Sequence, residues 1–120
     1  MKVEGGCHCG LVRWEAYLPD GPVEVLDCNC SICTMTGYLH LIVPEDRFRQ
    51  TEGKRDMGLY RFGSGEARHL FCTQCGIKSF YRPRSHPKGI SLNWRCLDED
   101  HGLEAQIVPF DGRNHPGRIA

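Results

Sequence analysis

The feature that most limits how this chain can fold is the placement of its cysteines. Eight cysteines occur in 120 residues, and seven of them stand in three short groups, "CHCG" (7–10), "CNCSIC" (28–33) and "CTQCG" (72–76). Only Cys96 stands alone. Closely spaced thiols are typical of metal ligands, and cysteines in reducing compartments bind metal or do chemistry more often than they form disulfides. Because the count is even and the chain small, four disulfides are the alternative.

The first and third groups together predict a structural metal site. Each of these groups ends in two thiols followed directly by a glycine. A turn that aims two sulfurs at one ion brings the backbone close to them, and glycine permits that turn without a Cβ clash. The four thiols Cys7, Cys9, Cys72 and Cys75 would hold one tetrahedral zinc ion, with iron–sulfur ligation as the alternative. Such an ion contributes on the order of 10 kcal/mol to folding.

The second group, Cys28, Cys30 and Cys33, offers three thiols and no obvious fourth ligand. A strand end can present Cys28 and Cys30 on one side, and the turn that follows can bring Cys33 to the same ion. Three protein ligands and an open fourth position are typical of catalytic zinc, which can activate a thiol or polarise a carbonyl. In one alternative Cys96 closes the site, and in another the three are buried free thiols.

Most of the chain alternates apolar and polar residues with period two, which predicts a mainly β fold. The clearest strands are expected at 11–17 and 89–96, and Cys96 would lie on the inward face of the second. Further strands are expected at 23–27, 38–44, 59–63, 67–72, 77–83 and 103–110. Short helical turns are expected at 31–36, with Ser31 as N-cap and Gly37 as the stop, and at 44–48.

Charge and hydropathy exclude some classes of partner. Fifteen Lys and Arg balance fifteen Asp and Glu, which disfavours a general electrostatic binder of nucleic acid or membranes. No apolar run approaches ~18 residues, and "MKVEGGCHCG" lacks the apolar segment of a secretion signal. We therefore expect a cytoplasmic protein with one domain over 1–120, its core within about 3–113 and an irregular tail from 111 onward.

Several basic and imidazole side chains are candidates for roles beside the thiols. Basic residues cluster after the third cysteine group, namely Lys78, Arg82, Arg84, Lys88 and Arg95. Arginine pairs with carboxylates through two parallel hydrogen bonds, so Arg82, Arg84 or Arg95 could bind an anionic thiol substrate, unless they only form a solvated strand face. His40 and His69 could move protons near pH 7, with a structural, hydrogen-bonded histidine as the alternative for each.

The order of these motifs resembles the glutathione-dependent formaldehyde-activating enzyme family, which includes centromere protein V. The resemblance rests on "GGCHCG", "CNCSIC", "FCTQCGIKSFYRPRS", "NWRCLDE" and "PFDG" and covers about residues 3–113. It implies an Mss-four-like fold of coiled antiparallel β-sheets stapled by zinc, related in shape to methionine sulfoxide reductase B. It also implies two zinc ions per chain: a structural ion on Cys7, Cys9, Cys72 and Cys75, and a more labile one on Cys28, Cys30 and Cys33.

The family's named activity joins formaldehyde to glutathione, and its reverse is a carbon–sulfur lyase reaction. The resemblance therefore implies an enzyme that acts on an adduct of glutathione, or another small thiol, with an aldehyde, at the zinc held by Cys28, Cys30 and Cys33. His40 is a candidate proton carrier. "LHLIVP", "YRPRS" and "CLDE" are closer to the centromere protein V branch, so a non-catalytic binding module with Cys96 closing the second zinc site is the alternative. Redox or metal handling by the thiols is a third hypothesis.

Overall fold

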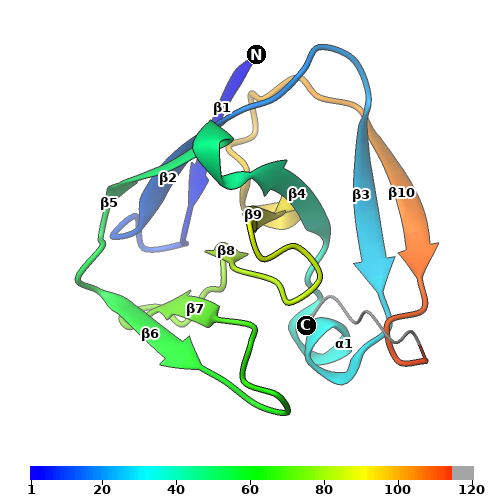
Figure 1. The fold of residues 1–120 in the computed structure, drawn as a ribbon. Coiled ribbons are helices and arrows are strands. Elements are labelled where there is room, and N and C mark those ends of the chain that lie inside the picture. The colour runs from blue at the N-terminus through cyan, green and yellow to red at the C-terminus, as the bar shows by residue number, and fades with distance from the viewer. Residues whose placement is uncertain (115–120) are drawn as a thin grey trace.

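The computed structural model describes residues 1–114, which form three small β-sheets and one short α-helix (Figure 1). One sheet orders β1 (Lys2–Gly6), β2 (Arg13–Tyr17) and β5 (Phe48–Glu52). A larger sheet orders β10 (Ala105–Phe110), β3 (Val23–Cys28), β4 (His40–Pro44), β9 (Gly89–Asn93) and β8 (Phe80–Tyr81). The third pairs β6 (Met57–Tyr60) with β7 (His69–Cys72). The mainly β class expected from the sequence is confirmed.

Strand pairing within residues 1–114 is antiparallel, as expected, except for β3 and β10. These two run parallel, with Val23 opposite Ala105 and Cys28 opposite Phe110. The chain returns to the start of β3 before β10 begins, and the Val23 amide donates to the Glu104 carbonyl at 2.9 Å. Both strands therefore end at the same edge (Figure 1), which brings the residues after β10 to the second cysteine group.

Two buried clusters organise the interior. The larger one joins the first two sheets through side chains such as Trp14 of β2, Leu41 of β4 and Leu92 of β9. Burial of each large apolar side chain there contributes about 1.5–3 kcal/mol to the stability of the folded state. The smaller cluster contains all three cysteines of the second group, together with Tyr38, Ala67 and Tyr81. The second cysteine group is thus part of the interior and is not a surface loop.

Several element boundaries follow local signals and others do not. The helix α1 (Ser31–Thr36) has the expected bounds and ends at Gly37, whose φ of 66° suits glycine, although Cys30 and not Ser31 occupies the N-cap. A 3-10 helix at Glu45–Arg47 falls within the expected turn at 44–48. The pattern did not indicate β1 and β5, because β1 ends in glycines and β5 is mostly polar.

The expected strand at 89–96 ends early. β9 stops at Asn93, whose side chain accepts a hydrogen bond from the Arg95 amide at 3.1 Å, and Trp94–Cys96 form a 3-10 helix. Cys96 therefore does not continue the inward face of the strand. Of the expected irregular tail, residues 111–114 leave β10 in a turn, and residues 115–120 lie outside the described part of the chain. No helix in residues 1–114 is long and apolar enough to cross a membrane.

Candidate metal centres

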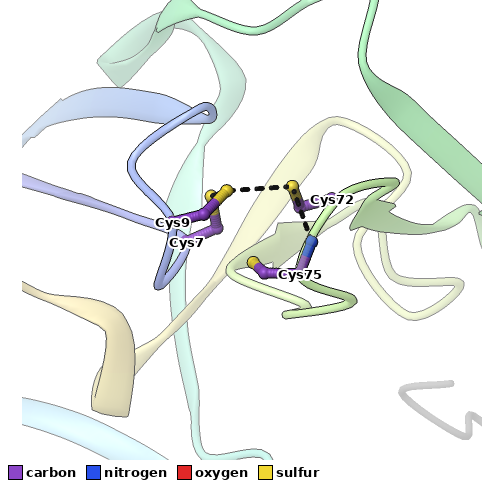
Figure 2. A group of neighbouring side chains, drawn as sticks. All are labelled: Cys7, Cys9, Cys72 and Cys75. Atoms are coloured by element: carbon purple, nitrogen blue, oxygen red, sulfur yellow. Dashed lines mark hydrogen bonds between the residues drawn. The ribbon is translucent and has the colours of Figure 1, made fainter.

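The first and third cysteine groups meet at one point in space. Cys7 and Cys9 lie in the loop between β1 and β2, and Cys72 and Cys75 lie at and just after the end of β7 (Figure 2). All four sulfurs lie within 4.8 Å of one another, with 3.6 Å from Cys7 to Cys9 and 3.7 Å from Cys9 to Cys72. A tetrahedral zinc site with Zn–S bonds of about 2.3 Å separates its sulfurs by about 3.8 Å. The four thiols therefore fit a tetrahedral zinc ion.

Backbone amides lie close to the sulfurs of the first centre. The amides of Gln74 and Cys75 donate to the Cys72 sulfur at 3.4 and 3.5 Å. Gly10 and Gly76 follow the two thiol pairs with φ angles of 81° and 77°, a conformation that glycine adopts without steric cost. The glycine after each pair thus lets the loop turn so that amide donors and sulfurs converge.

The second group is also brought together by the fold. Cys28 ends β3, Cys30 precedes α1 and Cys33 lies within α1, and their sulfurs lie within 4.8 Å of one another. All three side chains are buried, and the Cys30 amide donates to the Cys28 sulfur at 3.5 Å. A hydrogen bond with Cys33 lowers the pKa of Cys30 to about 5 and raises the pKa of Cys33. Three clustered sulfurs, one of which loses its proton easily, suit a metal ion that the protein binds from one side.

Cys96 is not part of this group. Among residues 1–114, no other cysteine, histidine or carboxylate atom lies within 4.8 Å of all three sulfurs. Cys96 instead lines a cleft of about 600 Å³ together with Cys7 and Arg95, next to the first metal centre. The geometry therefore leaves the fourth position of the second centre without a protein sulfur.

Buried polar side chains form hydrogen bonds with the second cysteine group and with one another. His40 is fully buried, with Nε2 at 3.0 Å from the Cys33 sulfur and Nδ1 at 2.9 Å from the Ser91 hydroxyl. The Tyr38 hydroxyl donates to the Ser91 carbonyl at 2.7 Å. Burial lowers the pKa of His40 to about 3, so its imidazole is neutral. When Cys33 is a thiolate, Nε2 must carry the proton, and His40 then fixes that sulfur in place.

A pocket of about 250 Å³ opens beside the second group. Its lining includes Cys30 and two arginines, Arg84 and Arg113, together with the aromatic ring of Phe62. Two arginines and a cysteine in one pocket lining suit a small molecule that carries both a thiol and carboxylates.

The three arginines expected at the site have separate positions. Arg84 lines the pocket, whereas Arg82 binds Glu45 Oε2 at 2.7 Å and the Pro87 carbonyl at 3.2 Å. Arg95 lines the cleft beside Cys96, and its Nε donates to the Gly37 carbonyl at 3.2 Å. The fold thus brings one of the three to the pocket.

Sequence reasoning missed Arg113, because the segment after β10 lacks any periodic pattern. In the structure this segment is anchored on Asn29, whose side-chain amide donates to Asp111 at 2.9 Å and whose oxygen accepts from the Arg113 amide at 3.0 Å. Gly112 packs directly against Cys28, since a Cβ placed there would lie 2.4 Å from its sulfur. The "PFDG" motif was the available signal that this segment is ordered.

Comparison with known proteins decides the family. The family model described as glutathione-dependent formaldehyde-activating enzyme matches residues 2–111. The chain belongs to this family. A protein of Halomonas elongata, provisionally named a glutathione-dependent formaldehyde-activating enzyme, is 26% identical over 97% of this chain and 78% of its own length. A crystal structure of a Rhodobacter sphaeroides protein matches with a TM-score of 0.75 and 31% identity, over 88% of this chain and 99% of that one.

Membership of the glutathione-dependent formaldehyde-activating enzyme family confirms the resemblance seen in the sequence. The family's name supports chemistry on glutathione and an aldehyde, and the two cysteine groups are able to hold metal ions.

Proposed function

We propose that this protein is a carbon–sulfur lyase-type enzyme that acts on the adduct of glutathione, or another small thiol, with an aldehyde such as formaldehyde. One observation carries the proposal: Cys30, one of three clustered sulfurs, opens onto a pocket that also holds Arg84 and Arg113. Family membership supports the choice of thiol and aldehyde. A cytoplasmic location, where glutathione is abundant and thiols stay reduced, belongs to the same proposal.

Two zinc ions per chain are part of this proposal. Cys7, Cys9, Cys72 and Cys75 would hold the structural ion, and Cys28, Cys30 and Cys33 would hold the second. When bound, the second ion would supply a Lewis acid with one coordination position open to substrate. His40 would keep Cys33 aimed at the site through its Nε2–H bond.

The protein's own residues account for the binding and orientation of the substrate. Arg84 and Arg113 bind the carboxylates of the thiol substrate, so that its sulfur lies next to Cys30. The thiol first gives its proton to water, and the resulting thiolate attacks the carbonyl carbon of the aldehyde. The carbon–sulfur bond forms, the C=O π pair moves to oxygen, and the oxygen takes a proton back from water. The reverse sequence releases thiol and aldehyde. We assign the fully buried His40 to orienting Cys33, and its role as a proton carrier stays a prediction.

A binding module with Cys96 closing the second site has less support, since Cys96 lies in a different cleft. The proposal is tested by mixing zinc-loaded protein with glutathione and formaldehyde and following S-hydroxymethylglutathione by exchange NMR. We expect interconversion faster than the spontaneous reaction, and glutathione binding by calorimetry. A rate equal to the uncatalysed one, together with no heat of glutathione binding, would falsify the proposal.

A further inference from the structure

Lys78 is an unusual residue in this fold, because it is the one buried lysine or arginine in residues 1–114, with 9% of its surface exposed. Its ammonium group donates to His69 Nδ1 at 2.7 Å and lies 3.8 Å from the ring centre of Tyr81 and 4.9 Å from that of Tyr38. No carboxylate of the described residues lies within 4.0 Å of it. A buried cation without an anion is costly, so its counter-charge must come from another group.

The second cysteine group is a source of negative charge in the same buried cluster as the two rings that contact Lys78. Tyr38 and Tyr81, whose rings contact the Lys78 ammonium, belong to the same buried cluster as the three cysteines. Burial lowers the pKa of Lys78 to about 8, while Cys33 and Cys30 act in the opposite direction, so the group is mainly charged at neutral pH. The ammonium therefore contacts two aromatic rings that pack in the same buried cluster as the three cysteines.

The charge balance of the second centre requires such a cation. Three thiolates around a divalent ion leave a net charge of −1, and a substrate thiolate in the fourth position would make the net charge −2. Uncompensated charge of this size in a buried site is unfavourable. In the first centre, by contrast, Cys9 is exposed, so that water shares in solvating the charge.

We infer that Lys78 is the counter-cation of the second metal centre, and that it favours entry of the substrate as a thiolate by offsetting the excess negative charge. This inference rests on the proposed function. Lys78 is a positioning residue, since it acts through the field it creates and its ammonium contacts the rings of Tyr38 and Tyr81. His69, stacked on Tyr81 with 4.9 Å between ring centres, holds the ammonium in place.

The test compares Lys78→Met with Lys88→Met, a matched change at an exposed lysine. Protein with zinc in the first centre is titrated with Co²⁺, whose thiolate charge-transfer absorption reports the second centre, and then with 2-mercaptoethanol as a thiol without carboxylates. We expect Lys78→Met to weaken both Co²⁺ and thiol binding by about tenfold or more, as changes in outer-shell partners do. Lys88→Met should match the wild type.

The outcomes separate this inference from the proposed function. Wild-type protein that binds no Co²⁺ at the second centre, or no thiol on it, overturns both. Wild-type binding that Lys78→Met leaves unchanged within twofold overturns the inference alone. A catalytically inactive protein whose metal and thiol binding still depend on Lys78 supports the inference and removes the enzymatic proposal.

A second background keeps the test decisive if Lys78→Met unfolds the wild-type chain. In a Cys28→Ser, Cys30→Ser, Cys33→Ser protein all three thiolates are gone, and Lys78 becomes a buried cation without a counter-charge. Adding Lys78→Met there should raise the melting temperature, because it removes that unmatched charge. A lower melting temperature in this background would mean that Lys78 serves packing, and the inference would be wrong.

Discussion

At the scale of single residues, Gly112 shows how closely the segment after β10 packs on the second cysteine group. A Cβ at this position would lie 2.4 Å from the Cys28 sulfur, which real side chains do not tolerate. The neighbouring Asp111 and Arg113 are both bonded to Asn29, so the segment has little freedom to move away. The sulfur of Cys28 must therefore shift if this glycine is replaced.

The first prediction is that Gly112→Ala selectively impairs the second metal centre. Overpacking of this kind costs about 1–3 kcal/mol, and here the strain falls on a metal ligand. Metal analysis of purified protein should show the second ion reduced or lost, with the first ion retained. Asn114→Ala, in the same turn and bonded within residues 1–114 to the exposed Asp111, is the control and should keep both ions. Full metal content in Gly112→Ala would contradict the predicted contact.

A second prediction concerns Cys30, which lines the pocket and is one of the three sulfurs of the second group. Cys30→Ser should lose the second ion while the fold survives, because the first centre holds the sheets together without it. Metal content and circular dichroism check both parts. If the variant is unfolded, the second centre is structural and the proposed open site is wrong.

At the scale of elements, local sequence signals were enough to predict those elements whose conformation depends on neighbouring residues. The helix α1 was predictable from the turn residues around the second cysteine group, and its end at Gly37 follows from the left-handed conformation there. The end of β9 at Asn93 rests on a local hydrogen bond from the Arg95 amide, which the alternating pattern of 89–96 does not reveal. The parallel pairing of β3 with β10 was not predictable, because it depends on contacts between distant segments. Arg113 was missed for the same reason.

The pocket assembled by these elements gives a third prediction. Arg84→Met and Arg113→Met should each raise the dissociation constant for glutathione by about tenfold to a hundredfold, since a charge-assisted hydrogen bond contributes about 1.5–3 kcal/mol. Neither change should affect the binding of 2-mercaptoethanol, which has no carboxylate. Calorimetry with both thiols measures the difference.

Arg82→Met is the matched control for the pocket, because Arg82 bonds to Glu45 and lies outside the pocket lining. It should leave glutathione binding unchanged. Equal losses in all three variants would show that the arginines act through general charge and that the pocket is not the binding site.

At the scale of the whole molecule, the first cysteine cluster joins parts of the chain that are far apart in the sequence. It ties the β1–β2 loop to the end of β7, and Cys9 and Cys72 are 63 positions apart. The sequence predicted this pairing because a tetrahedral site needs four thiols and two pairs were available. It did not predict how the three sheets are arranged around the site, since that depends on packing of the whole core.

The last prediction follows from this role as a clamp. Cys75→Ser should remove the first ion and lower the melting temperature far more than Cys30→Ser does, because structural zinc contributes on the order of 10 kcal/mol, comparable with the whole stability of a small domain. Thermal unfolding by circular dichroism, with metal content measured in parallel, compares the two variants with Cys96→Ser, whose sulfur belongs to neither group. A strong chelator should melt the wild type in the same way. If Cys75→Ser and Cys30→Ser unfold at the same temperature, the two centres contribute equally to stability, and the division into a structural and a substrate-binding ion must be abandoned.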